Sequence, residues 1–176
     1  GAVLTVVSIT APGVALGAVH SFTGGDDGAN PNALVRAANG SLYGTTQYGG
    51  TNLAGTVFRL APGGAVVPLY SFTGGEDGAA PMAALAEGPD GNLYGTAYQG
   101  GAYDNGTVFR MTPDGALSAL VSFNITNGDL PCSGLVLGAD ANFYGTTYQG
   151  GAGGRGTVFR ISTNNELATL YSFSNG

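Results

Sequence analysis

The pentapeptide GTVFR occurs at 55–59, again at 106–110 and again at 156–160 of this 176-residue chain. The spacings between the copies are 51 and 50 residues. Self-similarity at a fixed period of this length is typical of solenoids, propellers and arrays, in which one repeat is a supersecondary unit that cannot bury its apolar face alone. GTVFR is therefore first a structural motif, and its recurrence predicts a repeat architecture.

Two further motifs recur in step with GTVFR. A tyrosine motif precedes each copy, as SLYGTTQYGG (41–50), NLYGTAYQGG (92–101) and NFYGTTYQGG (142–151). A Ser-Phe motif stands further upstream, as SFTGGDDGANP (21–31), SFTGGEDGAAP (71–81) and the degraded SFNITNGDLP (122–131), and a fourth Ser-Phe pair lies at 172–173. These landmarks predict one domain made of a half repeat (1–24) and three repeats (25–73, 74–123 and 124–176).

The composition is that of a folded, turn-rich and weakly charged chain. Its 33 Gly and 8 Pro are many, but a hydrophobic content of 43% with 9 Tyr and 8 Phe opposes disorder. Only 9% of the residues are charged, and the formal net charge is −6. Five basic residues, all Arg, against eleven acidic ones cannot easily supply a basic face, so we expect no nucleic acid and no anionic membrane as partner.

The apolar stretch at 2–19 does not have the pattern of a transmembrane helix. Such a helix needs about 20 uninterrupted apolar residues, and Pro12-Gly13 breaks this run. We predict two strands in this stretch and no membrane insertion.

Each repeat is predicted to contain four antiparallel strands. In the middle repeat the strand candidates are MAALAEG (82–88), NLYGTAY (92–98), GTVFRMT (106–112) and ALSALVSF (116–123). Asp90-Gly91 joins the first pair and Asp114-Gly115 the second, and Asp-Gly indicates a tight hairpin because both central residues tolerate positive φ. Such units, without helical periodicity, predict an all-β fold of propeller-like blades, with a stacked β-sandwich or solenoid array as the alternative.

GTVFR itself is predicted to be an inner strand. Alternation places Thr107 and Phe109 on one face, and Val108 with Arg110 on the other. The arginine recurs in every repeat, as Arg59, Arg110 and Arg160. We interpret these arginines as structural, with hydrogen bonds to backbone carbonyls or to a carboxylate where sheets pack, and keep ligand contact as the alternative.

The chain resembles the GloVer tandem repeat, found in predicted secreted or surface-anchored bacterial proteins. The resemblance lies in the combination of SFTGGxDGxxP, DGNLYGT and QGGAxxxGTVFR. The resemblance covers 15–176; residues 124–130 depart from the pattern and 1–14 fit it loosely. It implies an extracellular or cell-surface, glycine-rich, all-β repeat region. It carries over no catalytic residue and no cofactor.

The sequence offers little for catalysis. His20 is the only histidine and stands at a strand position before Ser-Phe, where later copies have Tyr70, Val121 and Tyr171. The usual nucleophile, zinc, P-loop and dinucleotide motifs do not occur, and Cys132 is the only cysteine. We therefore expect a non-enzymatic protein without a cofactor, in which His20 is structural.

Two sets of residues are candidate ligand contacts. The acidic loops centred on Asp27 and Asp77 are weak calcium candidates, since Ca²⁺ wants six to eight oxygen ligands, and a turn capped by side chains is the favoured interpretation. Aromatic and amide side chains in the tyrosine motif could stack on and hydrogen-bond a glycan. These candidates are Tyr48, Tyr98, Gln99, Tyr148 and Gln149, and packing of the tyrosines within the loop is the alternative.

Two functions follow, and the first is preferred: an extracellular structural protein that assembles with itself, or a carbohydrate-binding, lectin-like module. Segments 3–10 and 15–22 align with the third and fourth strands of a repeat, so the chain begins with a half unit whose edge and apolar face need a cover. We expect a homo-oligomer, either a ring of seven units from two chains or a head-to-tail filament or surface layer. The assembly residues are predicted to be Val3, Leu4, Val6, Val7 and Ile9.

Overall fold

The computed structural model describes residues 3–6, 17–162 and 164–175. These residues form strands and loops, and they contain no helix. The strands are β1 (Val3–Val6), β2 (Gly17–Ser21), β3 (Ala29–Pro31), β4 (Val35–Arg36), β5 (Leu42–Tyr48), β6 (Thr56–Leu60), β7 (Val66–Ser71), β8 (Ala86–Glu87), β9 (Leu93–Ala97), β10 (Thr107–Met111), β11 (Leu117–Ser122), β12 (Asp129–Pro131), β13 (Val136–Leu137), β14 (Phe143–Gln149), β15 (Thr157–Ile161) and β16 (Leu167–Ser172). Within the described segments, nothing helical is long and apolar enough to cross a membrane.

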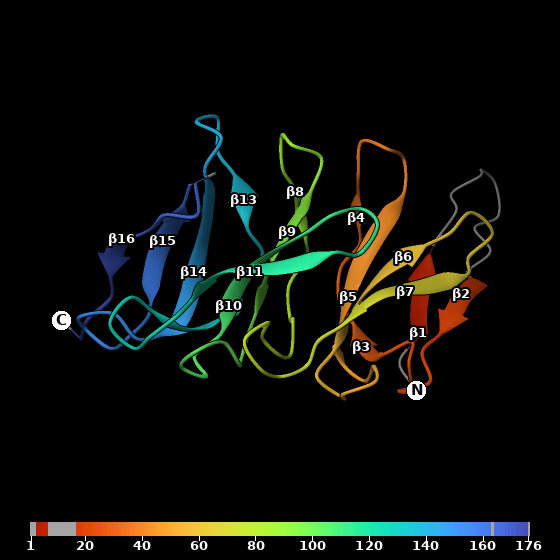
Figure 1. The fold of residues 1–176 in the computed structure, drawn as a ribbon, viewed down its shortest axis with the longest axis horizontal. Coiled ribbons are helices and arrows are strands. Elements are labelled where there is room, and N and C mark those ends of the chain that lie inside the picture. The colour runs from red at the N-terminus through yellow and green to blue at the C-terminus, as the bar shows by residue number, and fades with distance from the viewer. Residues whose placement is uncertain (1–2, 7–16, 163, 176) are drawn as a thin grey trace.

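The strands form antiparallel sheets that follow one another along the chain. We call them the N-terminal hairpin (β1–β2), the first sheet (β3–β7), the middle sheet (β8–β11) and the third sheet (β12–β16). In the first and third sheets two short strands share one edge of the sheet, because β3 and β4 both pair with β5, and β12 and β13 both pair with β14. The sheets stand in an open row with the N-terminal hairpin at one end and the third sheet at the other (Figure 1). The predicted antiparallel unit, four strands wide, is confirmed.

GTVFR forms an inner strand in every repeat, as predicted. β10 lies between β9 and β11, and Phe109 pairs with Gly95 of the tyrosine motif. A Cβ on Gly95 would lie 2.5 Å from Cζ of Phe109, so the ring of the pentapeptide requires a glycine opposite it. Gly44 and Gly145 meet Phe58 and Phe159 in the same way. Two of the recurring motifs are therefore halves of one packing arrangement.

The N-terminal hairpin is the third and fourth strand of a repeat, as predicted. In the first sheet the register between third and fourth strand shifts between Val57 and Phe58, and the other sheets shift at the equivalent place. The pairing of β1 with β2 shifts between Leu4 and Thr5. A shared bulge at the same position of the strand pair identifies the same structural unit. Residues 7–16, which include part of the predicted strands, lie outside the described residues.

The hairpin turn between β8 and β9 differs from the expected geometry. Between β8 and β9, Gly91 N–H donates to the Gly88 carbonyl (3.0 Å) and Gly88 N–H donates to the Asn92 carbonyl (2.8 Å). Gly91 has a φ of +73°, but Asp90 does not adopt a positive φ. The turn is thus of type I followed by one left-handed residue, and not a turn with two positive φ values. Pro89 suits this turn, because its ring fixes the φ that the first central position of a type I turn needs.

The hydrophobic core lies between consecutive sheets. One cluster joins the first and middle sheets through Tyr43 and Val57 on one side and Phe109 and Met111 on the other. A second cluster joins the middle and third sheets with the equivalent residues of the next two repeats. Because no single sheet closes a core by itself, stability comes from stacking one repeat on the next.

Candidate functional site

One aromatic contact joins each unit to the next. The phenylalanine of a Ser-Phe motif packs on the GTVFR phenylalanine of the following unit. Ring centroids lie 5.2 Å apart for Phe22 and Phe58, 5.2 Å for Phe72 and Phe109, and 5.0 Å for Phe123 and Phe159. All three contacts have the tilted or edge-on geometry that aromatic pairs prefer. The junction between repeats therefore has the same aromatic contact three times in the chain.

Hydrogen bonds across the junctions are repeated as well. The Thr45 hydroxyl donates to the Ala83 carbonyl (3.1 Å), and the Thr96 hydroxyl donates to the Ser133 carbonyl (3.0 Å). Backbone bonds also recur, from Ala80 N–H to the Ala54 carbonyl (2.8 Å) and from Leu130 N–H to the Asn105 carbonyl (3.0 Å). The hydrogen bonds hold the sheets at both junctions in the same relative position, and the phenylalanine rings supply the buried apolar area.

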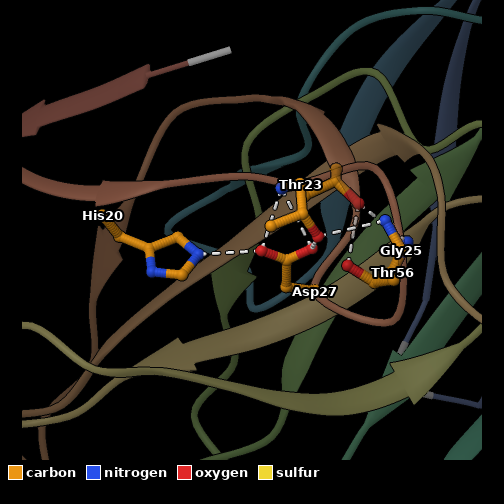
Figure 2. A network of polar contacts seen from close by, with 6 residues as sticks. His20, Thr23, Gly25, Asp27 and Thr56 are labelled. Atoms are coloured by element: carbon orange, nitrogen blue, oxygen red, sulfur yellow. Dashed lines mark hydrogen bonds and ion pairs between the residues drawn. The ribbon is translucent and has the colours of Figure 1, made fainter. Parts of the chain in front are cut away.

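A capped turn follows Phe22 (Figure 2). Asp27 Oδ1 accepts from the Thr23 hydroxyl at 2.5 Å, and Asp27 Oδ2 accepts from Thr23 N–H at 3.1 Å and lies 3.0 Å from His20 Nε2. Partial burial opposes ionisation of Asp27, but the hydrogen bonds from Thr23 and His20 outweigh it and lower its pKa. His20 also packs edge-on against Phe22. The side chains of His20 and Asp27 thus hold a turn, which is the structural role expected for this histidine.

The next Ser-Phe motif repeats this capped turn, and the third one modifies it. Asp77 accepts hydrogen bonds from the Thr73 hydroxyl, from Thr73 N–H (2.8 Å) and from the Tyr70 hydroxyl (2.9 Å). In the degraded motif the turn is one residue shorter, and the Asn127 side chain accepts from Asn124 N–H (2.9 Å). The carboxylates of the weak calcium candidates are directed into their own turns. Across the described ranges, no three His, Cys, Asp or Glu side chains are grouped so that they could hold a metal ion.

The turn before each tyrosine motif is tied to the tyrosine. The Tyr94 hydroxyl donates to Asp90 (2.9 Å), and the Tyr144 hydroxyl donates to Asp140 (2.7 Å). Hydrogen bonds from the Asn142 side chain and the Tyr144 hydroxyl lower the pKa of Asp140 to about 2. Burial and the bond to Asp90 raise the pKa of Tyr94. These acidic side chains serve the hairpins that carry them.

The GTVFR arginines do not make the expected hydrogen bonds. Arg59, Arg110 and Arg160 pair across the sheet with Tyr43, Tyr94 and Tyr144. In the part of the chain that the structure describes, their guanidinium groups bind neither a backbone carbonyl nor a carboxylate. In the second and third repeats the carboxylate at the turn, Asp90 or Asp140, accepts instead from the tyrosine hydroxyl. The guanidinium of Arg110 instead acts on Tyr94, whose raised pKa it opposes.

The candidate glycan contacts are not gathered into one site. Tyr48 and Tyr148 are 48% and 62% exposed, Gln99 and Gln149 are exposed, and Tyr98 is half-buried. Tyr48 aligns with Gln99 and Gln149, whereas Tyr98 and Tyr148 stand one residue earlier, so alternation along the strand places the two sets on opposite faces. The Tyr48 hydroxyl accepts a hydrogen bond from the side chain of its neighbour Gln47 (3.0 Å).

Of the predicted assembly residues, Val3, Leu4 and Val6 lie in β1. Val7 and Ile9 lie outside the described residues. In the described part of the chain β1 pairs with β2 alone, whereas the equivalent β6, β10 and β15 each have a strand on both sides. The role of the Ser-Phe phenylalanines at the junctions was not predicted from the sequence. The signal was present in the recurrence of Ser-Phe, including the fourth copy at 172–173.

Comparison with solved structures shows the fold. A protein described as a candidate gluconolactonase is 23% identical, with a TM-score of 0.58 over 93% of this chain and 55% of that chain. A gluconolactonase from Xanthomonas campestris is 18% identical, with a TM-score of 0.54 over 80% of this chain and 46% of that chain. A candidate 6-phosphogluconolactonase from Bacteroides uniformis is 18% identical, with a TM-score of 0.55 over 95% of this chain and 47% of that chain. The chain thus spans about half the length of these structures, and its sheets are propeller-like blades, as predicted.

No curated protein matches the chain by sequence. The family model described as the Gloeobacter/Verrucomicrobia repeat matches residues 4–176, which is almost the whole chain. The match includes the hairpin and all three motif-bearing repeats, and it confirms the resemblance seen in those motifs. The chain belongs to the Gloeobacter/Verrucomicrobia repeat family.

Proposed function

We propose that this chain is a non-catalytic structural module that assembles with itself. The observation that carries the proposal is the reuse of one junction, in which Phe72 on Phe109 and Phe123 on Phe159 have nearly the same geometry. A surface that binds the next unit twice within one chain is suited to bind a further unit between chains. The assembly is a filament or a surface layer.

The placement of acidic side chains supports a structural role. Asp27 and Asp77 cap the turns after the Ser-Phe motifs, and Asp90 and Asp140 hold the tyrosines of the next motif. A catalytic acid or base needs a free approach to its substrate. Here the acidic groups are directed to the backbone and side chains of their own turns. The proposed location, outside the cell or on its surface, rests on the resemblance of the motifs to secreted repeat proteins.

The proposed junction includes the N-terminal hairpin, with Val3, Leu4 and Val6 in β1 and Val7 and Ile9 beyond it. Among the described residues β1 pairs with β2 alone, and a strand edge without a partner is available for pairing. Light scattering of the intact chain over a dilution series measures the assembly, and deletion of residues 1–13 is expected to abolish it. An intact chain that stays monomeric at micromolar concentration would overturn the proposal. Circular dichroism of the deleted chain controls for loss of the remaining strands.

A carbohydrate-binding module is the second candidate, favoured by the exposure of Tyr48 and Tyr148. Exposed aromatic rings provide stacking surfaces for sugars, and a neighbouring amide can hydrogen-bond the hydroxyls. The solved propellers of similar fold are described as gluconolactonases, but at 18–23% identity the likeness concerns the fold alone. A glycan array distinguishes the two candidates: binding that Tyr148→Ala removes while assembly persists would favour the carbohydrate-binding module.

A further inference from the structure

The turn before each tyrosine motif has the same place in every repeat but not the same side chain. These turns lie between β4 and β5, between β8 and β9, and between β13 and β14, along one side of the row of sheets (Figure 1). The second and third turns carry Asp90 and Asp140, whereas the first carries Asn39 followed by Gly40. The first turn therefore has a side-chain amide where the others have a carboxylate.

Asn39 occupies the place of the two aspartates with nearly the same contacts. Its Oδ1 accepts from the N–H two residues later (2.9 Å), and Oδ1 of Asp90 does the same (3.1 Å). Its Nδ2 donates to the Tyr43 hydroxyl (3.0 Å), whereas the Tyr94 hydroxyl donates to Oδ2 of Asp90 (2.9 Å). An aspartate at position 39 would keep the first contact, and in the second the Tyr43 hydroxyl would become the donor.

Gly40 supplies a group that can convert this amide into a carboxylate. Its backbone nitrogen has no Cβ beside it, so it is the least hindered kind of backbone nucleophile. The Gly40 nitrogen bonds to Cγ of Asn39, its proton leaves with the side-chain NH2 as ammonia, and a cyclic imide closes. Water then opens the imide. Opening at Cγ gives an aspartate, and opening at the backbone carbonyl gives an isoaspartate, which lengthens the main chain of the turn.

The fold restrains the Asn-Gly steps of the chain differently. They occur at 39–40, 105–106, 127–128 and 175–176, and the last ends outside the described residues. In the first step both residues are exposed, and Gly40 N–H donates to the Ala37 carbonyl of the same turn (2.8 Å). In the second and third steps the asparagine is half-buried and the glycine is buried. Attack by Gly40 therefore needs one exposed turn to open, whereas attack by Gly106 or Gly128 needs buried backbone to separate.

We propose that Asn39 is a site of spontaneous deamidation, at which the folded chain converts its first turn into the aspartate form of the other two repeats. The product adds a carboxylate beside the junction of the first and middle sheets, where Glu87 Oε2 accepts from Ala38 N–H (2.8 Å). The formal net charge of −6 becomes one unit more negative. The inference is independent of the proposed self-assembly, because it concerns a single turn of the first sheet.

Peptide mapping separates the three steps that the structure describes, because trypsin cuts after arginine and the chain has no lysine. Asn39, Asn105 and Asn127 fall in the tryptic peptides 37–59, 60–110 and 111–155. The intact chain is incubated in mildly alkaline buffer, either folded or unfolded in urea, and mass spectrometry with fragmentation follows the exchange of amide for acid at each position.

In the folded chain, we expect position 39 to convert faster than positions 105 and 127 by on the order of tenfold or more, because local opening of an exposed turn is more frequent than opening of packed backbone. In urea the three positions should convert at similar rates. A folded chain in which position 39 converts no faster than the other two would overturn the proposal.

Gly40→Ala is the matched control for the chemical step. The third repeat has Ala141 at this position with a φ of +62°, and a Cβ on Gly40 would meet nothing within 4 Å, so the turn accepts an alanine. The added Cβ hinders the attacking nitrogen, and conversion at position 39 should slow several-fold while positions 105 and 127 are unaffected. An unchanged rate at position 39 would overturn the route through Gly40.

Asn39→Asp tests the fit of the product. Because the carboxylate takes the place of the amide, we expect the urea midpoint of this variant to equal that of the freshly prepared intact chain. A clearly lower midpoint would overturn the inference that the first turn accepts the aspartate as the other two repeats do.

Discussion

The middle and third sheets have almost the same motifs and the same strand register, but they differ in burial. Val108 and Tyr94 of the middle sheet are buried, whereas the equivalent Val158 and Tyr144 of the third sheet are half-exposed. The inward faces do not differ, since Phe109 and Phe159 are both fully buried. Burial in this fold is therefore decided by the neighbouring repeat and not by the motif in which a residue stands.

The largest effect on stability is expected at the Ser-Phe phenylalanine that follows each of these two sheets. Phe123→Ala should lower the free energy of unfolding by about 3–5 kcal/mol, because a fully buried ring stacked on Phe159 leaves a cavity. Phe173→Ala, at a concentration where the chain is monomeric, should cost about 1 kcal/mol or less. Urea titrations of both variants measure the difference. Equal losses would contradict the view that the neighbour determines burial.

The second-largest difference in stability is expected between two of the turns that follow Ser-Phe motifs. Asp77→Ala removes an acceptor for the Thr73 hydroxyl, Thr73 N–H and the Tyr70 hydroxyl, and we expect a loss of about 1–3 kcal/mol. Asn127→Ala removes the acceptor for one N–H, that of Asn124, and should cost about 0.5–1 kcal/mol. Thermal or urea unfolding ranks the two variants. A larger loss for Asn127→Ala would show that the shortened turn has taken over the capping role.

Alkaline pH should lower the stability contributed by the first of these two turns but not that contributed by the second. Burial and the hydrogen bond to Asp77 raise the pKa of Tyr70 to about 12, from about 10 in the unfolded chain, and Val121 stands at the equivalent position of the next repeat. The folded state keeps the Tyr70 proton longer than the unfolded state does. The resulting stability is present below pH 10 and is lost as the pH rises through about 12.

Tyr70→Phe removes this titrating group, while the other tyrosines stay in place. We expect the stability difference between the intact chain and Tyr70→Phe to shrink as the pH rises from about 10 to about 12. Urea titrations at several pH values measure it. Val121→Ala is the control, since it changes the equivalent position without a titrating group, and its difference from the intact chain should not depend on pH in this range.

Much of the fold could be predicted from the sequence because its signals are local and repeated. Apolar alternation placed GTVFR on an inner strand, and the spacing of Ser-Phe identified the N-terminal hairpin as half a repeat. The contacts of the arginines could not be predicted, because Asp90 and Asp140 are taken by tyrosines that stand four residues later. The difference in burial between Phe123 and Phe173 was also hidden, since the motifs around them look alike in sequence and differ in what packs on them.

The smallest expected effect concerns one left-handed residue in each sheet. Gly91 of the middle sheet and Ala141 of the third close the same turn, with N–H to carbonyl distances of 3.0 Å to Gly88 and Gly138. Their φ angles are +73° and +62°, a region that glycine enters freely and alanine does not.

At Gly91 a Cβ would meet nothing within 4 Å, so the effect of a side chain there is conformational and not steric. Gly91→Ala should lower the free energy of unfolding by about 1 kcal/mol, and Ala141→Gly should raise it by about 0.5–1 kcal/mol. Both changes should move the urea midpoint at an unchanged slope, because neither alters the surface exposed on unfolding. If Ala141→Gly lowers the midpoint, the third sheet tolerates its left-handed alanine for a reason other than backbone strain, and the equivalence of the two turns fails.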